Sequence, residues 1–129
     1  MQFQGGRKGT AWMKRKAASW HSNIDYIHNQ LPGPHVELGW SVKPSEWLKY
    51  EYFVSYDPYT FYTFAAAMSG VVSIVYPLAN TTKQQWLEGT YVGEYLKDQP
   101  NFNDAPGIAY GVGREEIQHA NQTKQQARK

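Results

Sequence analysis

The clearest pattern of apolar and polar positions lies in residues 50–77. Aromatic and β-branched residues dominate positions 52–56, and apolar residues fill nearly every position of 71–75, so each segment has the length and composition of a strand. Between them lies a helical pattern with an Ala-rich end, carried by Phe61, Phe64, Ala65 and Met68. A strand that is apolar on both faces is typical of a parallel sheet covered by helices. The pattern therefore predicts a βαβ unit.

Residues typical of helix starts and of helix ends give this helix its predicted bounds. Asp57 is a good N-cap, and Pro58 suits the first helical position because its missing N–H would have no partner there. Gly70 can take the left-handed conformation that often closes a helix. The sequence thus predicts a helix over residues 58–69.

The flanking segments continue the alternation of strands and helices. We expect short strands at 24–28 and 35–38, a short helix at 42–49, a helix from about 83 to 97, a last strand or turn at 107–111, and a polar helix from 113 onward. Thr81-x-x-Gln84 and Thr82-x-x-Gln85 are two possible capping boxes for the second long helix. The predicted fold class is α/β: one Rossmann-like three-layer domain with a small, mostly parallel sheet over residues 1–129, loose at 1–9 and 125–129.

In a βαβ unit of this kind, a ligand binds where the strand feeds the helix. That edge carries Asp57, Pro58, Tyr59 and Thr60. A helix N-terminus presents free N–H groups and a partial positive charge, which suit phosphate. The alternative is purely local, with Asp57 acting only as an N-cap and Thr60 only as a first-turn hydroxyl.

A second candidate for anion binding is the basic run near the N-terminus. Arg7, Lys8, Lys14, Arg15 and Lys16 supply five of the thirteen basic residues within ten positions, beside a Gly-rich turn. Arginine offers a fork that matches phosphate oxygens, and lysine adds a point charge, so the run suits a phosphate clamp. The alternatives are a solvated basic face and a nonspecific nucleic-acid patch.

The segment YFVSYDPYTFYTFAAAMSGVVSIVYP resembles the donor-binding part of C-terminal domains in GT-B-type glycosyltransferases. Those domains commonly show a strand, an acidic residue, a helix that ends in Ala-rich sequence and Gly, and a Val-rich strand. The stretch AAAMSGVV matches that ending, and the wider pattern of GRKGTAWMKRK, TKQQW and GIAYG resembles bacterial glycosyltransferase-like proteins, so the likeness covers about residues 5–118. Many retaining members carry a second Glu eight residues after the first acid, where this chain has Ala65.

The resemblance implies a domain that binds a nucleotide-diphosphate sugar as substrate, with no cofactor and no metal. A complete GT-B enzyme has two Rossmann-like domains and 129 residues suffice for one, so this chain would be a C-terminal domain, a fragment or one part of a split enzyme, completed by an N-terminal domain or partner chain. Arg15 and Lys16 would neutralise the diphosphate leaving group, and Asp57 would stand for the first acid. The implied donor-binding residues are Pro58, Tyr59, Thr60, Lys83 and Tyr110.

Lys83 and Tyr110 are also candidates because of their own positions. Lys83 lies in the first turn of a predicted helix, where a cation opposes the helix dipole, and such a misfit suggests a ligand-facing role. Tyr110 lies between two glycines and could stack on a base or a sugar ring. The alternatives are an exposed lysine and a tyrosine that only packs against the core.

Composition narrows the class of protein. A hydrophobic content of 41% and an aromatic content of 16% indicate a folded globular domain. The absence of Cys excludes disulfides and thiolate metal sites and fits the cytoplasm. His21, His28 and His35 lack the spacing of a metal site. No apolar run approaches the length of about 18 residues that a transmembrane helix needs.

Several functions remain open beside sugar transfer. The ten Tyr and five Trp residues would also suit a non-enzymatic carbohydrate- or protein-binding α/β module. A nucleic-acid binder would use the basic run, but the net charge of +2 does not favour it. A dinucleotide-dependent oxidoreductase is disfavoured because no G-x-G-x-x-G follows a predicted strand.

Overall fold

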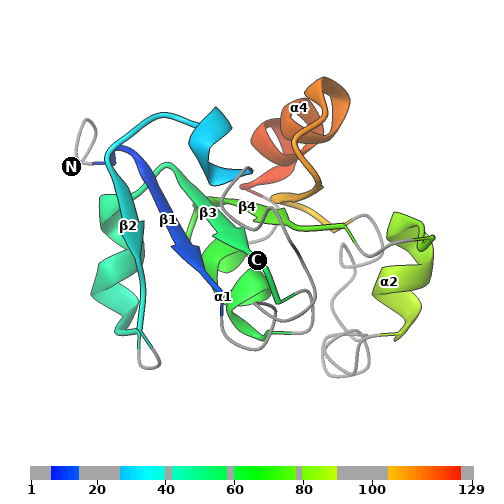
Figure 1. Cartoon of the computed structure of the whole chain (residues 1–129), viewed down its shortest axis with the longest axis horizontal. Coiled ribbons are helices and arrows are strands. Elements are labelled where there is room, and N and C mark those ends of the chain that lie inside the picture. The colour runs from blue at the N-terminus through cyan, green and yellow to red at the C-terminus, as the bar shows by residue number, and fades with distance from the viewer. Residues whose placement is uncertain are drawn as a thin grey trace.

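The fold is built on one sheet of five parallel strands. The computed structural model describes residues 7–14, 27–39, 42–57, 60–77, 80–89 and 105–125. Within them the strands are β1 (Thr10–Met13), β2 (His35–Glu37), β3 (Tyr52–Ser55), β4 (Val72–Val75) and β5 (Ile108–Tyr110). Their order across the sheet is β2-β1-β3-β4-β5, and every neighbouring pair is parallel (Figure 1). The predicted α/β class, with a small parallel Rossmann-like sheet, is confirmed.

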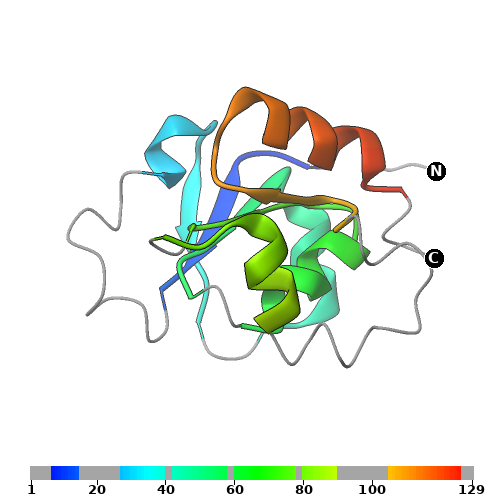
Figure 2. The same cartoon turned by 90° about the vertical axis from the view of Figure 1, so that its right-hand side faces the viewer.

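Helices cover both faces of this sheet. The described helical elements are the 3-10 helices η2 (His28–Gln30) and η3 (Pro44–Lys49) and the α-helices α1 (Tyr62–Met68), α2 (Lys83–Gly89) and α4 (Arg114–Thr123). Seen from the side in Figure 2, η2 and α4 lie above the sheet, whereas η3, α1 and α2 lie below it. The three layers agree with the predicted architecture.

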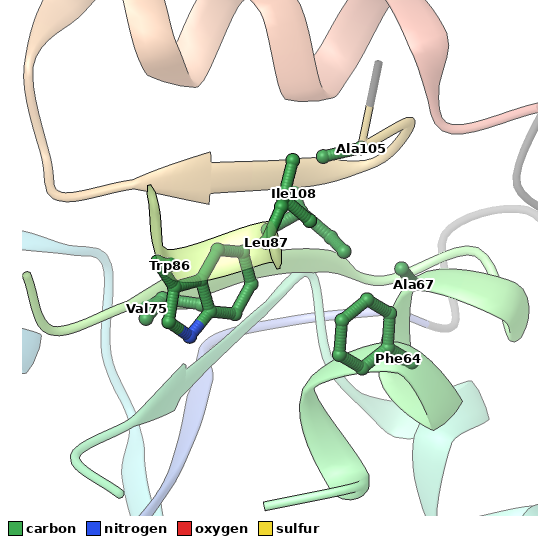
Figure 3. Close-up of a cluster of buried hydrophobic side chains, with 7 residues drawn as sticks. All are labelled: Phe64, Ala67, Val75, Trp86, Leu87, Ala105 and Ile108. Carbon is green, nitrogen blue, oxygen red and sulfur yellow. The ribbon is translucent and has the colours of Figure 1, made fainter. Parts of the chain in front are cut away.

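The alternation of side chains along each strand decides which layer they support. On one face, Val54, Tyr56 and Ile74 pack with Ile27 and with Ala120 of α4. The other face holds two clusters. In one of them Met13 and Phe53 pack with Trp47 of η3 and with α1. Figure 3 shows the second, in which α1, α2 and β5 meet: Phe64, Ala67, Val75, Trp86, Leu87, Ala105 and Ile108.

The central βαβ unit forms as predicted, but its helix begins later than residue 58. The N–H of Thr60 donates to the carbonyl of Asp57 (3.1 Å), which closes a turn before the helix. The Thr60 hydroxyl then accepts a hydrogen bond from the N–H of Tyr62 (3.3 Å) at the start of α1. Asp57 is therefore not the N-cap, because a turn is inserted between the strand and the helix. The predicted helix end is confirmed, since Gly70 follows α1 with φ of 92°.

Other predicted elements differ in kind or extent. The segment 35–38 contains β2 and 107–111 contains β5, as expected. In the segment 24–28, the expected strand is wrong where it can be seen, because His28 begins η2; residues 24–26 lie outside the described residues. The helix expected at 42–49 is the 3-10 helix η3. Its Trp47 is buried, whereas the neighbouring Leu48 is 59% exposed.

The capping of α2 confirms one of the two predicted boxes. The N–H of Thr82 donates to the side-chain oxygen of Gln85 (2.9 Å), and the N–H of Gln85 donates to the Thr82 hydroxyl (3.1 Å). These reciprocal bonds satisfy two N–H groups that the helix leaves free at its start. The described part of α2 ends at Gly89, and the expected continuation to residue 97 lies outside the described residues.

The strand that the sequence pattern misses is β1, which lies inside the sheet between β2 and β3. Gly9 leads into it with φ of 80°, and a side chain there would collide with the backbone of Pro34. The N–H of Thr10 donates to the carbonyl of Pro34 (2.9 Å). The close approach that Gly9 permits therefore brings the chain before β2 against the start of β1.

Candidate functional site

The strand order defines a topological switch point between β1 and β3. From β1 the chain proceeds to β2 on one side, and from β2 it returns to β3 on the other side. In open parallel sheets, including those with the order 2-1-3-4-5, ligands bind at the carboxyl ends of the two strands where the order reverses. Here those ends are followed by Lys14 after β1 and by Tyr56 and Asp57 after β3. We call this edge the switch-point edge.

The predicted residues of the 57–60 turn lie at this edge where they can be described. Asp57 is half-buried and directly follows Tyr56, whose N–H donates to the carbonyl of Met13 (3.0 Å). Thr60 is 5% exposed, and its hydroxyl accepts a hydrogen bond from the N–H of Tyr62. This role is local, but Thr60 precedes Phe61, the N-cap of α1, so its hydroxyl acts just ahead of the helix and not in its first turn. Pro58 and Tyr59 lie outside the described residues.

The structure divides the basic run between opposite edges of the sheet. Arg7 and Lys8 precede β1 and lie at its amino end, whereas Lys14 follows β1 at its carboxyl end. Four strand residues separate the ends by about 13 Å. Arg15 and Lys16 continue the chain from Lys14 but lie outside the described residues.

Arg7 has a structural role at the amino ends of the strands, which we call the amino edge. Its guanidinium donates to the carbonyl oxygens of Trp47 (2.7 Å), Tyr50 (3.3 Å) and Ser69 (2.8 Å). These carbonyls lie near the ends of η3 and α1, where backbone acceptors lack helical partners. Arg7 therefore ties two helix ends together and does not belong to a clamp with Lys14.

Lys83 and Tyr110 lie beyond β4, at the β5 side of the sheet. The Lys83 ammonium pairs with the Glu116 carboxylate (3.1 Å), which also accepts a hydrogen bond from the Tyr110 N–H (2.8 Å). The Tyr110 hydroxyl donates to the carbonyl of Thr81 (2.9 Å), and its ring packs on Trp86. Three strand spacings, about 14 Å, separate β5 from β1. The structure therefore does not bring these two residues together with Lys14, and their donor-binding role stays a prediction.

Sequence reasoning did not find the aromatic cluster at the switch-point edge. The cluster consists of Trp12, His28, Tyr56 and Tyr76, and we call it the edge cluster. The Trp12 and His28 rings are stacked, with centroids 4.4 Å apart and planes 5° from parallel. Tyr56 meets both rings edge-on, at 6.3 and 5.8 Å, and Tyr76 lies 5.5 Å from Tyr56. Tyr56 and Tyr76 directly follow β3 and β4, and Trp12 is the next-to-last residue of β1. Aromatic residues near the ends of three strands are the signal that the sequence contained.

Two hydrogen bonds fix His28 within this cluster. The backbone N–H of His28 donates to the Tyr56 hydroxyl oxygen (3.0 Å), and the same oxygen lies 2.9 Å from Nδ1 of the His28 ring. Tyr56 is fully buried and His28 is 5% exposed. Buried polar groups in this arrangement hold a single geometry, because moving either ring would break bonds that water cannot replace.

The shifted pKa values in the described part of the chain belong to a different place. A hydrogen bond from Lys49 holds the pKa of Glu46 below its ordinary value, and the same hydrogen bond raises the pKa of Lys49. Burial raises the pKa of Tyr50. These residues belong to η3 or directly follow it, ahead of β3, so they lie toward the amino edge. We interpret this group as a structural ion pair and not as part of the candidate site.

Neither a metal centre nor a membrane span emerges from the residues that can be described. Among them, no three His, Asp or Glu side chains gather as a metal site would require. His28 and His35 have ring centroids 5.6 Å apart, but Nε2 of His35 donates to the carbonyl of Leu31 (2.8 Å). No helix in the same part of the chain combines the length and hydropathy needed to cross a bilayer.

Comparison of the chain with protein-family models, with curated proteins and with solved structures gives no significant match in any of the three.

Proposed function

We propose that this chain is the nucleotide-sugar-binding domain of a glycosyltransferase, with the diphosphate of the donor held at the switch-point edge. The observation that carries the proposal is the strand order. It makes β1 and β3 neighbours, and Lys14 and Asp57 follow these two strands at the edge where open parallel sheets bind ligands. The resemblance of residues 52–77 to donor-binding domains points to the same edge.

The proposed chemistry is electrostatic. Departure of a nucleoside diphosphate leaves negative charge on its oxygens, and preorganised cations lower the energy of that charge most where water is scarce. Arg15 and Lys16, which follow Lys14 in the chain, would supply this stabilisation. Asp57, Pro58 and Tyr59 would contact the donor from the β3 side, whereas the buried Thr60 would hold the start of α1 behind them. An N-terminal domain or partner chain would contribute the catalytic base and the acceptor site.

The test is a calorimetric titration of the chain with UDP, GDP, ADP and CDP at two salt concentrations. We expect saturable binding that favours one base. An Arg15→Ala, Lys16→Ala double variant should bind that diphosphate at least about tenfold more weakly, since charge-assisted hydrogen bonds to phosphate are lost.

A control of equal charge separates a local contact from a general field effect. Lys8 and Lys49 are exposed and lie at the amino edge, where the Lys8 N–H donates to the Lys49 carbonyl. A Lys8→Ala, Lys49→Ala variant should therefore keep the affinity of the native chain. The proposal fails if no diphosphate binds, or if all bind equally and both double variants weaken binding to the same extent.

A second candidate function is a non-enzymatic module that binds a protein partner. It is favoured by the exposure of three large apolar side chains, Leu48 (59%), Phe61 (41%) and Met68 (39%), on η3 and at the two ends of α1. Exposed apolar side chains mark an interface where they form one contiguous patch, so this candidate requires the three side chains to be covered by the same partner. This candidate predicts no binding of diphosphates and an unchanged partner affinity in the Arg15→Ala, Lys16→Ala variant.

A further inference from the structure

We propose that the accessible part of the Trp12 indole is the platform on which the base of the nucleoside diphosphate stacks. This inference rests on the proposed function and adds to it the subsite for the base. Neither the sequence pattern nor the resemblance assigns a role to Trp12.

The position of Trp12 supports the assignment. It is the third residue of β1, paired in register with Val54 of β3 on one side and Glu37 of β2 on the other. The indole is only partly buried, although it lies on an inner strand of the sheet (Figure 1). Its Lys14 neighbour, two residues on and therefore on the same face, begins the basic stretch that the proposed function assigns to the diphosphate. A base on Trp12 would therefore lie next to the phosphate groups of the same ligand.

The ring is also held in place before any ligand arrives. His28 stacks against the indole with nearly parallel planes, and Tyr56 supports it edge-on. Both supporting side chains are buried, and the Tyr56 hydroxyl bonds twice to His28. A rigid aromatic surface binds a flat ring at low entropic cost, because no rotamer has to be fixed on binding. His28 and Tyr56 of the edge cluster thus hold the Trp12 indole in the orientation that a base would need for stacking.

The Lys14 ammonium covers the indole surface that a base would take. It lies 5.2 Å from the centroid of the Trp12 ring, a cation–π contact. Stacking of a base on an aromatic side chain is worth more than a partly exposed contact of this kind. A base would therefore replace the ammonium on the ring, and the Lys14 ammonium would contact the diphosphate instead. Ring and cation would then contact different parts of one ligand.

The experiment compares nucleoside diphosphates with inorganic pyrophosphate, which carries the phosphates without the base. Calorimetry on the native chain should show tighter binding of the preferred diphosphate than of pyrophosphate. Trp12→Leu should weaken the diphosphate about tenfold and leave pyrophosphate unchanged, whereas Trp12→Phe should keep most of the affinity. Lys14→Met should weaken both ligands alike. Trp47→Phe, which alters a buried ring on the opposite face, is the matched control and should change neither affinity.

A measurement on the native chain covers the case in which Trp12→Leu does not fold. The indole protons of Trp12, assigned by their absence in Trp12→Phe, should shift upfield in NMR spectra when the diphosphate binds and stay in place with pyrophosphate. Equal loss of both ligands in Trp12→Leu, or no loss of either, would refute the platform while leaving the proposed function intact. If the native chain binds no diphosphate, the proposed function fails and the platform fails with it.

Discussion

Removal of one buried hydroxyl at the switch-point edge is the sharpest test of how the structure holds this site. The substitution is Tyr56→Phe, which keeps the ring and deletes only the oxygen. That oxygen accepts from the His28 backbone N–H and lies 2.9 Å from the His28 ring nitrogen. Since Tyr56 is fully buried and His28 is 5% exposed, water cannot take over either bond without opening the layer between η2 and the sheet.

The expected magnitude follows from these two contacts. A buried polar group that loses its partner costs about 1–3 kcal/mol. The substitution removes the partner of two such groups on His28, so we expect the free energy of unfolding to fall by about 2–6 kcal/mol. For a chain of this length the midpoint of thermal unfolding should fall by roughly 10 °C or more.

Urea unfolding followed by far-UV circular dichroism measures the change, with Tyr110→Phe as the control. The Tyr110 hydroxyl donates to the carbonyl of Thr81 in a partly buried position, where water can replace the partner, so its loss should cost only about 1 kcal/mol. In a His28→Phe background, Tyr56→Phe should cost about half as much as in the native chain, since the ring nitrogen is already gone. The reasoning is refuted if Tyr56→Phe costs no more than Tyr110→Phe.

Three further outcomes are expected. Arg7→Met keeps the aliphatic part of the side chain but loses three hydrogen bonds to backbone carbonyls. The free energy of unfolding, measured by urea titration, should therefore fall by about 2–4 kcal/mol. A loss under about 0.5 kcal/mol would contradict the proposal that Arg7 joins the two helix ends. The hydroxyls of Ser55 and Thr63 are fully buried and 2.8 Å apart, so Ser55→Ala and Thr63→Val should each destabilise the chain, and the double variant should cost less than the sum of the two. Glu46→Gln should slightly lower stability at neutral pH. A carboxyl whose pKa is lower in the folded chain than its ordinary value of 4.5 stabilises the fold at pH values above 4.5, and this contribution is lost as the pH falls through the folded pKa. The stabilities of the native chain and of Glu46→Gln should therefore become equal in acid. A difference in stability that persists in acid would contradict the Glu46–Lys49 pair.

Local patterns predicted the elements whose signals lie within a few neighbouring residues. The apolar strand at 72–75 and the glycine that ends α1 could be read directly, because burial on both faces and a left-handed turn each demand particular residue types. The Thr82–Gln85 capping box is of the same kind, since its two partners are three residues apart. The late start of α1 was missed because Asp57-Pro58 suits a turn as well as it suits a helix N-terminus.

The candidate site shows a second limit of sequence reasoning. Asp57 and the basic residues after β1 were found from charge and position, but Trp12, His28 and Tyr56 were not joined, because 16 and 28 residues separate the consecutive members. Arg7 was grouped with Lys14 because they are close in sequence. The intervening strand is extended, so it carries them to opposite edges.

The fold class, the central βαβ unit and the edge at which Asp57 lies can be predicted from the residues alone, because the period of apolar residues and a few residues with special backbone preferences indicate them. Three features depend on contacts between distant segments: the inner position of the four-residue β1, the order β2-β1-β3-β4-β5, and the contact of Trp12, His28 and Tyr56 beside Lys14. Pairing and burial across the whole chain determine which strands become neighbours, and a four-residue strand is too short for its own pattern to predict them.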